Sequence, residues 1–166
     1  MATRAATIDA PPSAVWPWVV QMGFPSYRAG WYTPYWLDRL LWRTRARSSD
    51  VIVPELQELK PGDTVPDSID WSAYFVVREV EPPSRLVLHS TVHKIKPIRT
   101  VDFVWAFVLE PLDRDRTRLL VRARANYTPA WAGLVVEPLI WLGDVVNVTV
   151  MLRGIRQRVE TAARRS

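Results

Sequence analysis

Hydrophobic and polar residues alternate along two neighbouring segments in the second half of the chain. In the first segment, 101–109, large apolar side chains occupy every second position. In the second, 117–125, apolar residues alternate mostly with arginines. A period of two residues is typical of a β-strand with one buried face. The turn-forming residues 110–116 lie between the two segments, so the pattern predicts an antiparallel hairpin.

The last part of the chain has a different period. Between 145 and 162, apolar residues recur three or four positions apart, which places them on one side of an α-helix. The members of this stripe are Val145, Val148, Leu152, Ile155, Val159 and Ala162. A one-sided sheet and an amphipathic helix each need a partner, so we expect the helix to cover the sheet. The residues expected to point away from the sheet are Asn147, Met151, Gly154 and Arg158.

The first half of the chain predicts shorter elements. In chain order we expect a strand at 4–9, a helix from Pro12 to about Gly23, and a second short helix after Thr33 that ends near Leu41. The polar segment 43–50 is expected to be a loop. The further strands expected are a fragment at 51–53 and two longer ones at 71–80 and 85–92. This order predicts an α+β protein with two short helices after its first strand.

Several sequence words, together with this order of elements, resemble the START-like superfamily, which is also labelled SRPBCC or polyketide cyclase/dehydrase-like. The words lie at 8–18, 28–32, 53–57, 60–63, 105–112 and 151–155. The resemblance implies a helix-grip fold, in which a curved antiparallel sheet wraps around a long C-terminal helix and a hydrophobic cavity. It spans nearly the whole chain, so we expect a single domain at 1–166. The superfamily contains lipid carriers, hormone receptors and aromatase/cyclases, so the resemblance does not select one activity.

The aromatic content is high, with nine tryptophans, five tyrosines and four phenylalanines. Aromatic side chains build both ordinary cores and the walls of ligand pockets. The wall expected on the inner side of the sheet consists of Phe75, Val77, Leu86, Leu88, Phe103, Trp105, Phe107, Leu119 and Val121. The further ligand-binding candidates are Tyr32, Tyr35, Trp36, Glu55 and Asn126. We therefore expect non-covalent binding of a small hydrophobic or aromatic molecule between the sheet and the C-terminal helix.

Charge raises a second question, because the formal net charge is +5. Basic clusters can bind nucleic acid or a membrane surface, or they can be solvated helix faces. No nucleic-acid motif accompanies them, so we favour solvated faces and expect no nucleic-acid partner. A peripheral membrane or partner-binding protein that uses Trp131, Trp141 and the arginines stays open as an alternative. The clustered arginines are Arg39, Arg43, Arg45 and Arg47, then Arg153, Arg156, Arg158, Arg164 and Arg165.

Common catalytic signatures are absent from the sequence. It has no cysteine, no Gly-x-Ser-x-Gly and no Gly-x-Gly-x-x-Gly, so neither thiol, acyl-enzyme nor dinucleotide chemistry is expected. Its two histidines, His89 and His93, are four residues apart on a predicted strand and should share a face. That spacing separates them by about 13 Å, too far to share a metal ion. We expect surface histidines, and no metal or cofactor.

Two carboxylates in apolar contexts leave an enzymatic alternative open. Glu55 or Tyr32 could serve as the catalytic group of a polyketide cyclase or dehydratase, because a buried carboxyl can act as an acid or base. We favour simpler roles, with Glu55 bound to backbone amides or an arginine and Asp102 on the outer face. The apolar run at 130–152 is interrupted by charged residues and predicts a core helix. With no signal-peptide pattern at the N-terminus, we expect a cytoplasmic protein.

Overall fold

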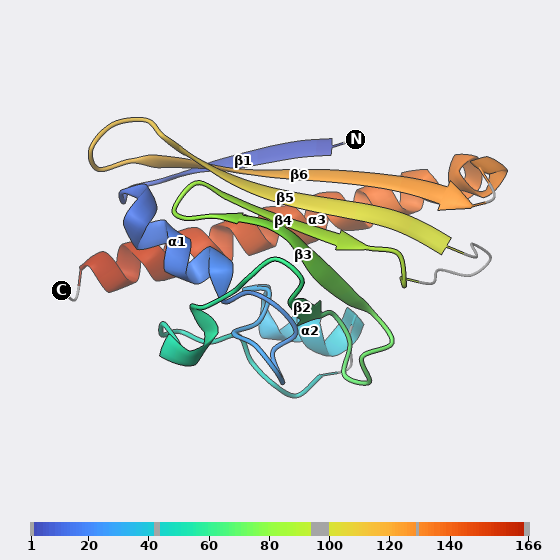
Figure 1. Cartoon of the computed structure of the whole chain (residues 1–166), viewed down its shortest axis with the longest axis horizontal. Coiled ribbons are helices and arrows are strands. Elements are labelled where there is room, and N and C mark those ends of the chain that lie inside the picture. Colours follow the sequence, from blue (N-terminus) through green and yellow to red (C-terminus); the bar gives the residue numbers. More distant parts are fainter. Residues whose placement is uncertain (1, 42–43, 94–99, 129, 165–166) are drawn as a thin grey trace.

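The computed structural model describes residues 2–41, 44–93, 100–128 and 130–164 (Figure 1). The side chains at 41, 100, 128 and 130–141 are also outside the described part of the chain. The predictions for Arg43, Arg165, Trp131 and Trp141 therefore fall on residues or side chains that are not described. The observed elements are β1 (Ala2–Ile8), α1 (Pro12–Val20), α2 (Tyr35–Leu41), the 3₁₀ turn η1 (Pro54–Leu56), β2 (Thr64–Pro66), β3 (Tyr74–Glu81), β4 (Arg85–Ser90), β5 (Thr100–Pro111), β6 (Thr117–Thr128) and α3 (Ala130–Ala163). This order confirms the predicted helix-grip architecture.

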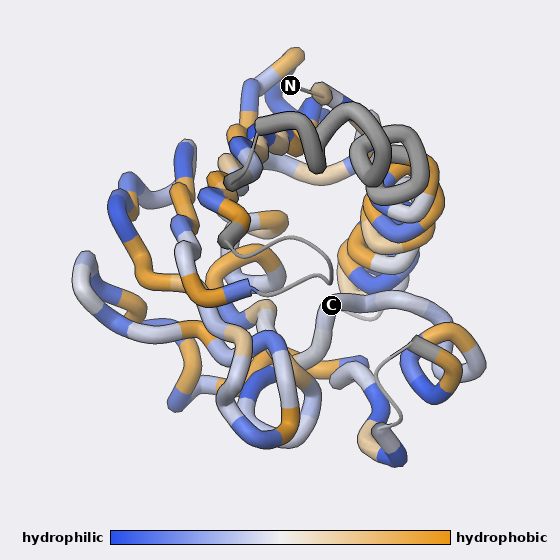
Figure 2. The backbone as a smooth tube through the Cα atoms, turned by 90° about the vertical axis from the view of Figure 1, so that its right-hand side faces the viewer, coloured by the Kyte–Doolittle hydropathy of each residue, from blue (hydrophilic) through white to orange (hydrophobic). Residues whose placement is uncertain are grey.

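The strands form one six-stranded antiparallel sheet in the order β1-β6-β5-β4-β3-β2. Strands β5 and β6 make its longest pair, in which Trp105 faces Ala123, and on the other side Trp105 faces Leu88 of β4. Residues opposite each other across a ladder share a face. Successive side chains of a strand point to opposite faces, so a sheet with one buried face alternates apolar and polar residues along its strands. Figure 2 shows such alternating hydrophobic and hydrophilic segments. All nine predicted wall residues lie in the core or pack against it, on what we call the inner face.

Helix α3 covers this inner face, mainly along β1 and β6. Four members of its predicted stripe are buried, namely Val148, Leu152, Ile155 and Val159, whereas Val145 is half-buried and Ala162 is exposed. The predicted stripe is thus confirmed over its central part. Among the described residues, no helix combines the length and the apolar character needed to cross a bilayer.

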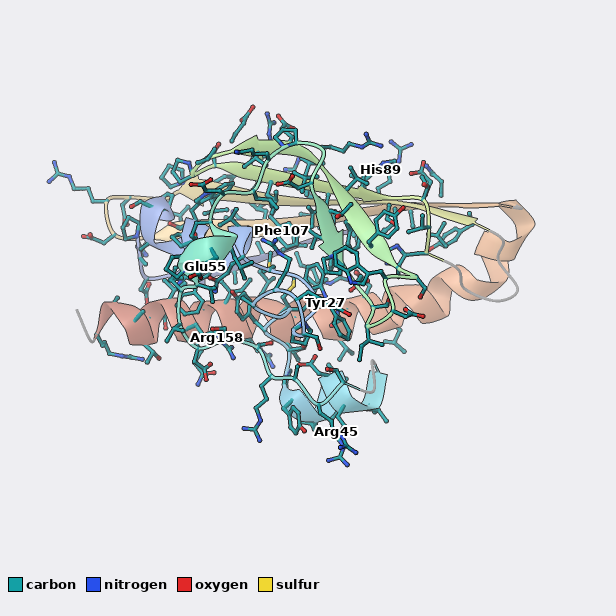
Figure 3. The ribbon with its side chains drawn as sticks, turned by 60° about the horizontal axis from the view of Figure 1, so that its bottom comes forward. Tyr27, Arg45, Glu55, His89, Phe107 and Arg158 are labelled. Atoms are coloured by element: carbon teal, nitrogen blue, oxygen red, sulfur yellow. The ribbon has the colours of Figure 1, made fainter. Side chains whose placement is uncertain are left out.

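The opposite side of α3 is also covered, which the sequence pattern did not predict. Figure 3 shows α3 lying between the sheet and α2. Met151 is fully buried, and a methyl group added to Gly154 would overlap the carbonyl oxygen of Tyr32. The side chain of Arg158 donates hydrogen bonds to the backbone of Ser49 at 2.8 Å and of Gly154 at 3.2 Å. Gly154 and Arg158, which we expected to point away from the sheet, thus contact segment 31–50 on this side of the helix, and the solvated position that we favoured for Arg158 was wrong.

The predicted strand fragment at 51–53 was also wrong. These residues run beside α1, and their backbone groups bond to the fully buried side chain of Gln21 instead of a neighbouring strand. Gln21 accepts a hydrogen bond from the Val53 amide at 2.9 Å and donates one to the Val51 carbonyl at 3.2 Å. A single side chain thus replaces the pairing that a strand would require.

Candidate functional site

Five aromatic rings meet on the inner face, and we call them the ring cluster: Trp31, Phe75, Phe103, Trp105 and Phe107. Trp105 lies at its centre, with ring centroids 5.4 to 5.7 Å from the other four. Strands β3 and β5 supply four of the rings, whereas Trp31 comes from the loop between α1 and α2. These separations are typical of packed aromatic pairs. The cluster contains three predicted site residues of β5 and one of β3, together with a tryptophan that was not among them.

Two polar atoms inside the ring cluster have no partner. The indole Nε1 atoms of Trp31 and Trp105 are both buried, and neither has a hydrogen-bond partner in the described part of the chain. Leaving a buried donor unpaired costs about 1–3 kcal/mol. Buried tryptophan N–H groups normally find an acceptor. The two rings have centroids 5.4 Å apart, and a ligand's acceptor atom would be favoured beside an indole N–H group that lacks a hydrogen bond.

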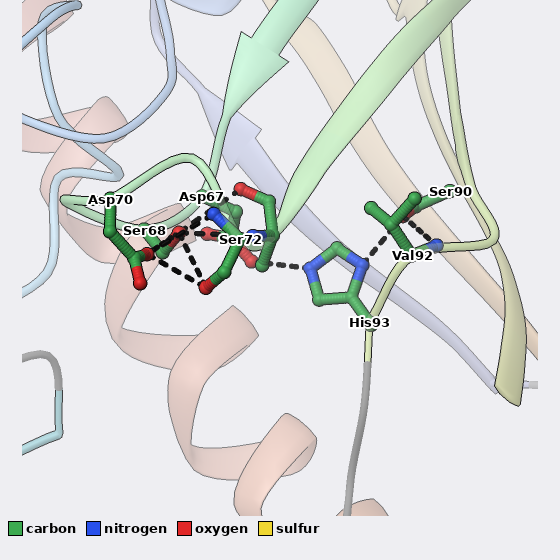
Figure 4. Close-up of polar contacts among 8 residues, drawn as sticks. Asp67, Ser68, Asp70, Ser72, Ser90, Val92 and His93 are labelled. Atoms are coloured by element: carbon green, nitrogen blue, oxygen red, sulfur yellow. Dashed lines mark hydrogen bonds and ion pairs between the residues drawn. The ribbon is translucent and has the colours of Figure 1, made fainter. Parts of the chain in front are cut away.

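One side of the ring cluster borders a chain of hydrogen bonds, the Asp67–His93–Ser90 chain (Figure 4). Nε2 of His93 lies 2.9 Å from Oδ2 of Asp67, and Nδ1 lies 2.7 Å from Oγ of Ser90. The imidazole also packs on the ring cluster, with centroids 4.9 Å from Phe75 and 6.3 Å from Phe103. Ser90 is the last residue of β4 and faces Phe103 across the ladder, so it too belongs to the inner face.

The loop that carries Asp67 is held closed by its own polar groups. The Asp70 carboxylate accepts hydrogen bonds from the hydroxyls of Ser68 at 2.8 Å and Ser72 at 2.7 Å, as Figure 4 shows. Burial raises the pKa of the Asp67 carboxyl, and this effect outweighs the opposing hydrogen bond and charge of His93. The indole of Trp31 also lies close enough to lower this pKa slightly, although it does not reach normal hydrogen-bond geometry.

The two histidines do not share a face, which corrects the sequence prediction. Strand β4 ends at Ser90, so the alternation that would place His93 beside His89 stops before it. His89 lies on the outer face, with its Nε2 2.7 Å from Asp102 and its Nδ1 2.9 Å from Nη2 of Arg78. Asp102 is therefore on the outer face, as we favoured. Within the described ranges, no three His, Asp or Glu side chains gather as metal ligands would.

Asn126 is another predicted site residue that lies on the outer face. It pairs with Asp102 in the β5–β6 ladder and donates a long hydrogen bond, 3.5 Å, to that carboxylate. The expectation that Asn126 is a polar group of the pocket is corrected by this register. The side chain of Trp36 is 64% exposed on α2, and Glu55 is exposed on η1, so neither belongs to the ring cluster.

The tyrosine candidates also lie apart from the ring cluster. The Tyr32 hydroxyl donates to the Trp18 carbonyl at 3.0 Å and accepts from Nε2 of Gln21 at 2.8 Å, and burial raises its pKa far above the usual range. This hydroxyl is thus occupied within the core. Tyr35 lines a cleft of about 440 Å³ on the far side of α3, where the guanidinium of Arg47 lies 4.6 Å from its ring centre.

Arginine 158 also lines this cleft, and its environment departs from the solvated face that we favoured. Its guanidinium pairs with Asp50 at 2.9 Å and lies 5.0 Å from the centre of the Tyr32 ring. Only 18% of its side chain is exposed. By contrast, Arg156 is half-exposed and pairs with Glu160 one turn further along α3. The sequence pattern did not distinguish the two, because both belong to the same run of arginines near the end of the chain.

No family model matches the chain, and no curated protein matches it by sequence. Solved structures do match it in fold. A conserved protein from Geobacillus kaustophilus is 13% identical with a TM-score of 0.57, and the match covers 96% of this chain and 95% of that one. Norcoclaurine synthase from Thalictrum flavum, in complex with dopamine and hydroxybenzaldehyde, is 13% identical with a TM-score of 0.56, covering 96% and 86%.

The di-domain ARO/CYC BexL from the BE-7585A biosynthetic pathway is 15% identical with a TM-score of 0.54. The match covers 96% of this chain but only 46% of BexL, so this chain spans less than half of that protein. The chain shares the helix-grip fold with these solved structures. At these identities, the similarity establishes the fold and leaves the activity to be argued from the site.

Proposed function

We propose that this protein binds, without covalent attachment, a small aromatic molecule that carries a hydrogen-bond acceptor such as a carbonyl oxygen. The binding surface is the ring cluster on the inner face. The observation that carries the proposal is the buried indole N–H group of Trp105, which has no hydrogen-bond partner among the described residues. The buried indole N–H group of Trp31 also lacks a hydrogen bond of normal geometry, and the Asp67 carboxylate lies close to it. A ligand oxygen would satisfy the Trp105 donor and remove the cost of leaving it unpaired.

The surroundings of the two donors favour a flat and neutral ligand. The ring centroid of Phe75 lies 5.7 Å from that of Trp105 and 6.0 Å from that of Trp31, so an aromatic ring packs beside both indoles. A charged ligand would lose hydration in such an apolar setting without a paired countercharge. The fold supports the proposal because norcoclaurine synthase, which shares it, holds the aromatic molecules dopamine and hydroxybenzaldehyde in its structure.

Two matched compounds test the proposal. Both 2-acetylnaphthalene and 2-ethylnaphthalene are flat and of similar size, but only the ketone has an acceptor. We expect the ketone to bind about fivefold more tightly, since one net hydrogen bond contributes about 1 kcal/mol and about 1.4 kcal/mol corresponds to a factor of ten. Affinities are measured by titration, and the indole N–H resonances are followed in nitrogen-15 NMR spectra.

The indole signals locate the bound ketone. Resonances of Trp31 and Trp105, assigned through single tryptophan-to-phenylalanine variants, should move on addition of the ketone. Those of Trp36 and Trp71, which are 64% and 42% exposed, serve as internal controls and should stay in place. Equal affinity for the two compounds, or shifts confined to the exposed tryptophans, would contradict the proposal.

A further inference from the structure

We propose that His93, oriented by Asp67, is an acid–base catalytic residue that removes a proton from the carbon next to the carbonyl group of a bound aromatic ketone. This inference rests on the proposed function, since it requires a ligand on the ring cluster. It differs from the enzymatic alternative drawn from the sequence, in which Glu55 or Tyr32 was the reacting group. Those two residues are exposed and hydrogen-bonded within the core, respectively.

The hydrogen bonds of His93 suit a base. A neutral imidazole has one N–H donor and one lone pair. The acceptor at Nε2 is the carboxylate of Asp67, so Nε2 carries the proton and Nδ1 carries the lone pair. In the free protein, this lone pair faces the hydroxyl of Ser90 at 2.7 Å. Oγ of Ser90 also accepts the Val92 amide at 3.3 Å, so the serine keeps a partner when its hydroxyl turns away from Nδ1.

The base and the unpaired donors surround the same aromatic ring. The ring centroid of Phe75 lies 4.9 Å from that of the His93 imidazole, 5.7 Å from that of Trp105 and 6.0 Å from that of Trp31. A ketone bound beside Phe75 would therefore have indole N–H groups and the imidazole of His93 on side chains that contact the same ring. Removal of the proton places negative charge on the oxygen, where fixed N–H donors stabilise it most.

The reaction needs no co-reactant. The C–H bond breaks, its proton moves to Nδ1 of His93, and its electron pair forms the enolate. Asp67 balances the positive charge of the imidazolium. In a β,γ-unsaturated ketone the enolate is conjugated with the C=C bond, so the proton can return to the γ-carbon, which isomerises the ketone. In a β-hydroxy ketone the proton goes to the hydroxyl group, the bond between the β-carbon and oxygen breaks, and water leaves. The substrate class is therefore an aromatic ketone with an acidic hydrogen beside the carbonyl.

The chain contains a matched pair that should lack this activity. His89 also bonds to a carboxylate, that of Asp102, at 2.7 Å. However, the Nδ1 atom of His89 accepts a hydrogen bond from the side chain of Arg78, and the pair lies on the outer face away from the ring cluster. A comparison of the two histidines therefore separates a base beside bound ligand from a histidine–aspartate pair alone.

The probe is 5-nitrobenzisoxazole, a flat aromatic carbon acid. A base takes its C–H proton, the N–O bond breaks, and coloured 2-cyano-4-nitrophenolate forms without any other reactant. We expect His93→Gln to lower the protein-catalysed rate by about 100-fold or more, the usual range for a positioned base. His89→Gln should stay within about twofold of wild type. Binding of the probe is measured separately by quenching of tryptophan fluorescence, and folding by circular dichroism.

Asp67→Asn provides the second variant, because asparagine retains an oxygen acceptor for Nε2 and only the charge is lost. We expect kcat to fall about tenfold with KM unchanged. A merely structural role would change stability or KM instead. If the probe binds but wild type and His93→Gln turn it over equally, the inference is overturned and the proposed function stands. If the probe neither binds nor reacts, both fail. An equal loss in His89→Gln would also overturn it.

Discussion

The unpaired indole of Trp105 leads to a prediction about stability that separates its apolar ring from its N–H group. Trp105 is 5% exposed and packs against the other four members of the ring cluster. Replacing it with alanine removes the whole ring, and we expect a loss of about 3–5 kcal/mol in the free energy of unfolding. Phe107→Ala, which removes a buried ring without a polar atom, should cost a similar amount.

Replacing Trp105 with phenylalanine should have a much smaller effect. The substitution removes two ring carbons, which at about 0.8 kcal/mol for each buried carbon group costs about 1.6 kcal/mol. It also removes an unpaired buried donor, whose cost is about 1–3 kcal/mol. The difference places the variant between about 0.6 kcal/mol less stable and about 1.4 kcal/mol more stable than wild type. The same variant should lose the preference for 2-acetylnaphthalene over 2-ethylnaphthalene.

Urea unfolding followed by far-ultraviolet circular dichroism measures all three variants, and equal m-values show that the comparison is valid. The reasoning is refuted if Trp105→Phe costs more than about 3 kcal/mol. The indole N–H would then contribute stability in the free protein, which requires an acceptor such as a bound water. In that case the indole N–H group already has an acceptor in the free protein, and the central argument for the proposed function fails.

Three further predictions concern helix α3 and its neighbours. Gly154→Ala should destabilise the protein by several kcal/mol, since the added methyl group overlaps a loop carbonyl, whereas Gly143→Ala meets nothing and should gain up to about 1 kcal/mol in urea unfolding. Arg158→Glu should lower the melting temperature by more than Arg156→Glu, because only Arg158 joins the helix to segment 49–50. Burial raises the pKa of the Asp38 carboxyl, so the native state holds this proton more tightly than the unfolded state. Wild type should therefore lose stability relative to Asp38→Asn as pH rises above about 4, and a constant difference from pH 3 to 7 would contradict this.

Much of the fold could be predicted from local patterns. The alternation at 101–109 and 117–125 predicted β5, β6 and the inner position of Trp105, because the side chains of a strand point to opposite faces in strict succession. The apolar stripe from Val148 to Val159 predicted the sheet-facing side of α3 for the same kind of reason. Each of these inferences depends only on residues close together in the sequence.

The second covered side of α3 depended on tertiary structure. Gly154 has no side chain to reveal that a loop packs on it, and Arg158 resembles any solvated cation on a helix. Their roles arise because segment 31–50, far away in the sequence, packs against the helix there. A pattern of hydrophobic residues records which positions are apolar, and does not record a close approach between two backbones.

The candidate site was decided mainly by tertiary structure. The sequence by itself determined that Phe75, Phe103 and Trp105 face inward, because their strands have a regular period. The sequence also predicted that His93 lies on the same strand as His89, because Thr91 and Val92 favour extended structure. In the structure, that strand ends at Ser90. His93 then meets Asp67 from 26 residues away, and Trp31 enters the ring cluster from a loop. Such contacts depend on how separate segments pack together, and packing between distant segments leaves no periodic signal along the chain.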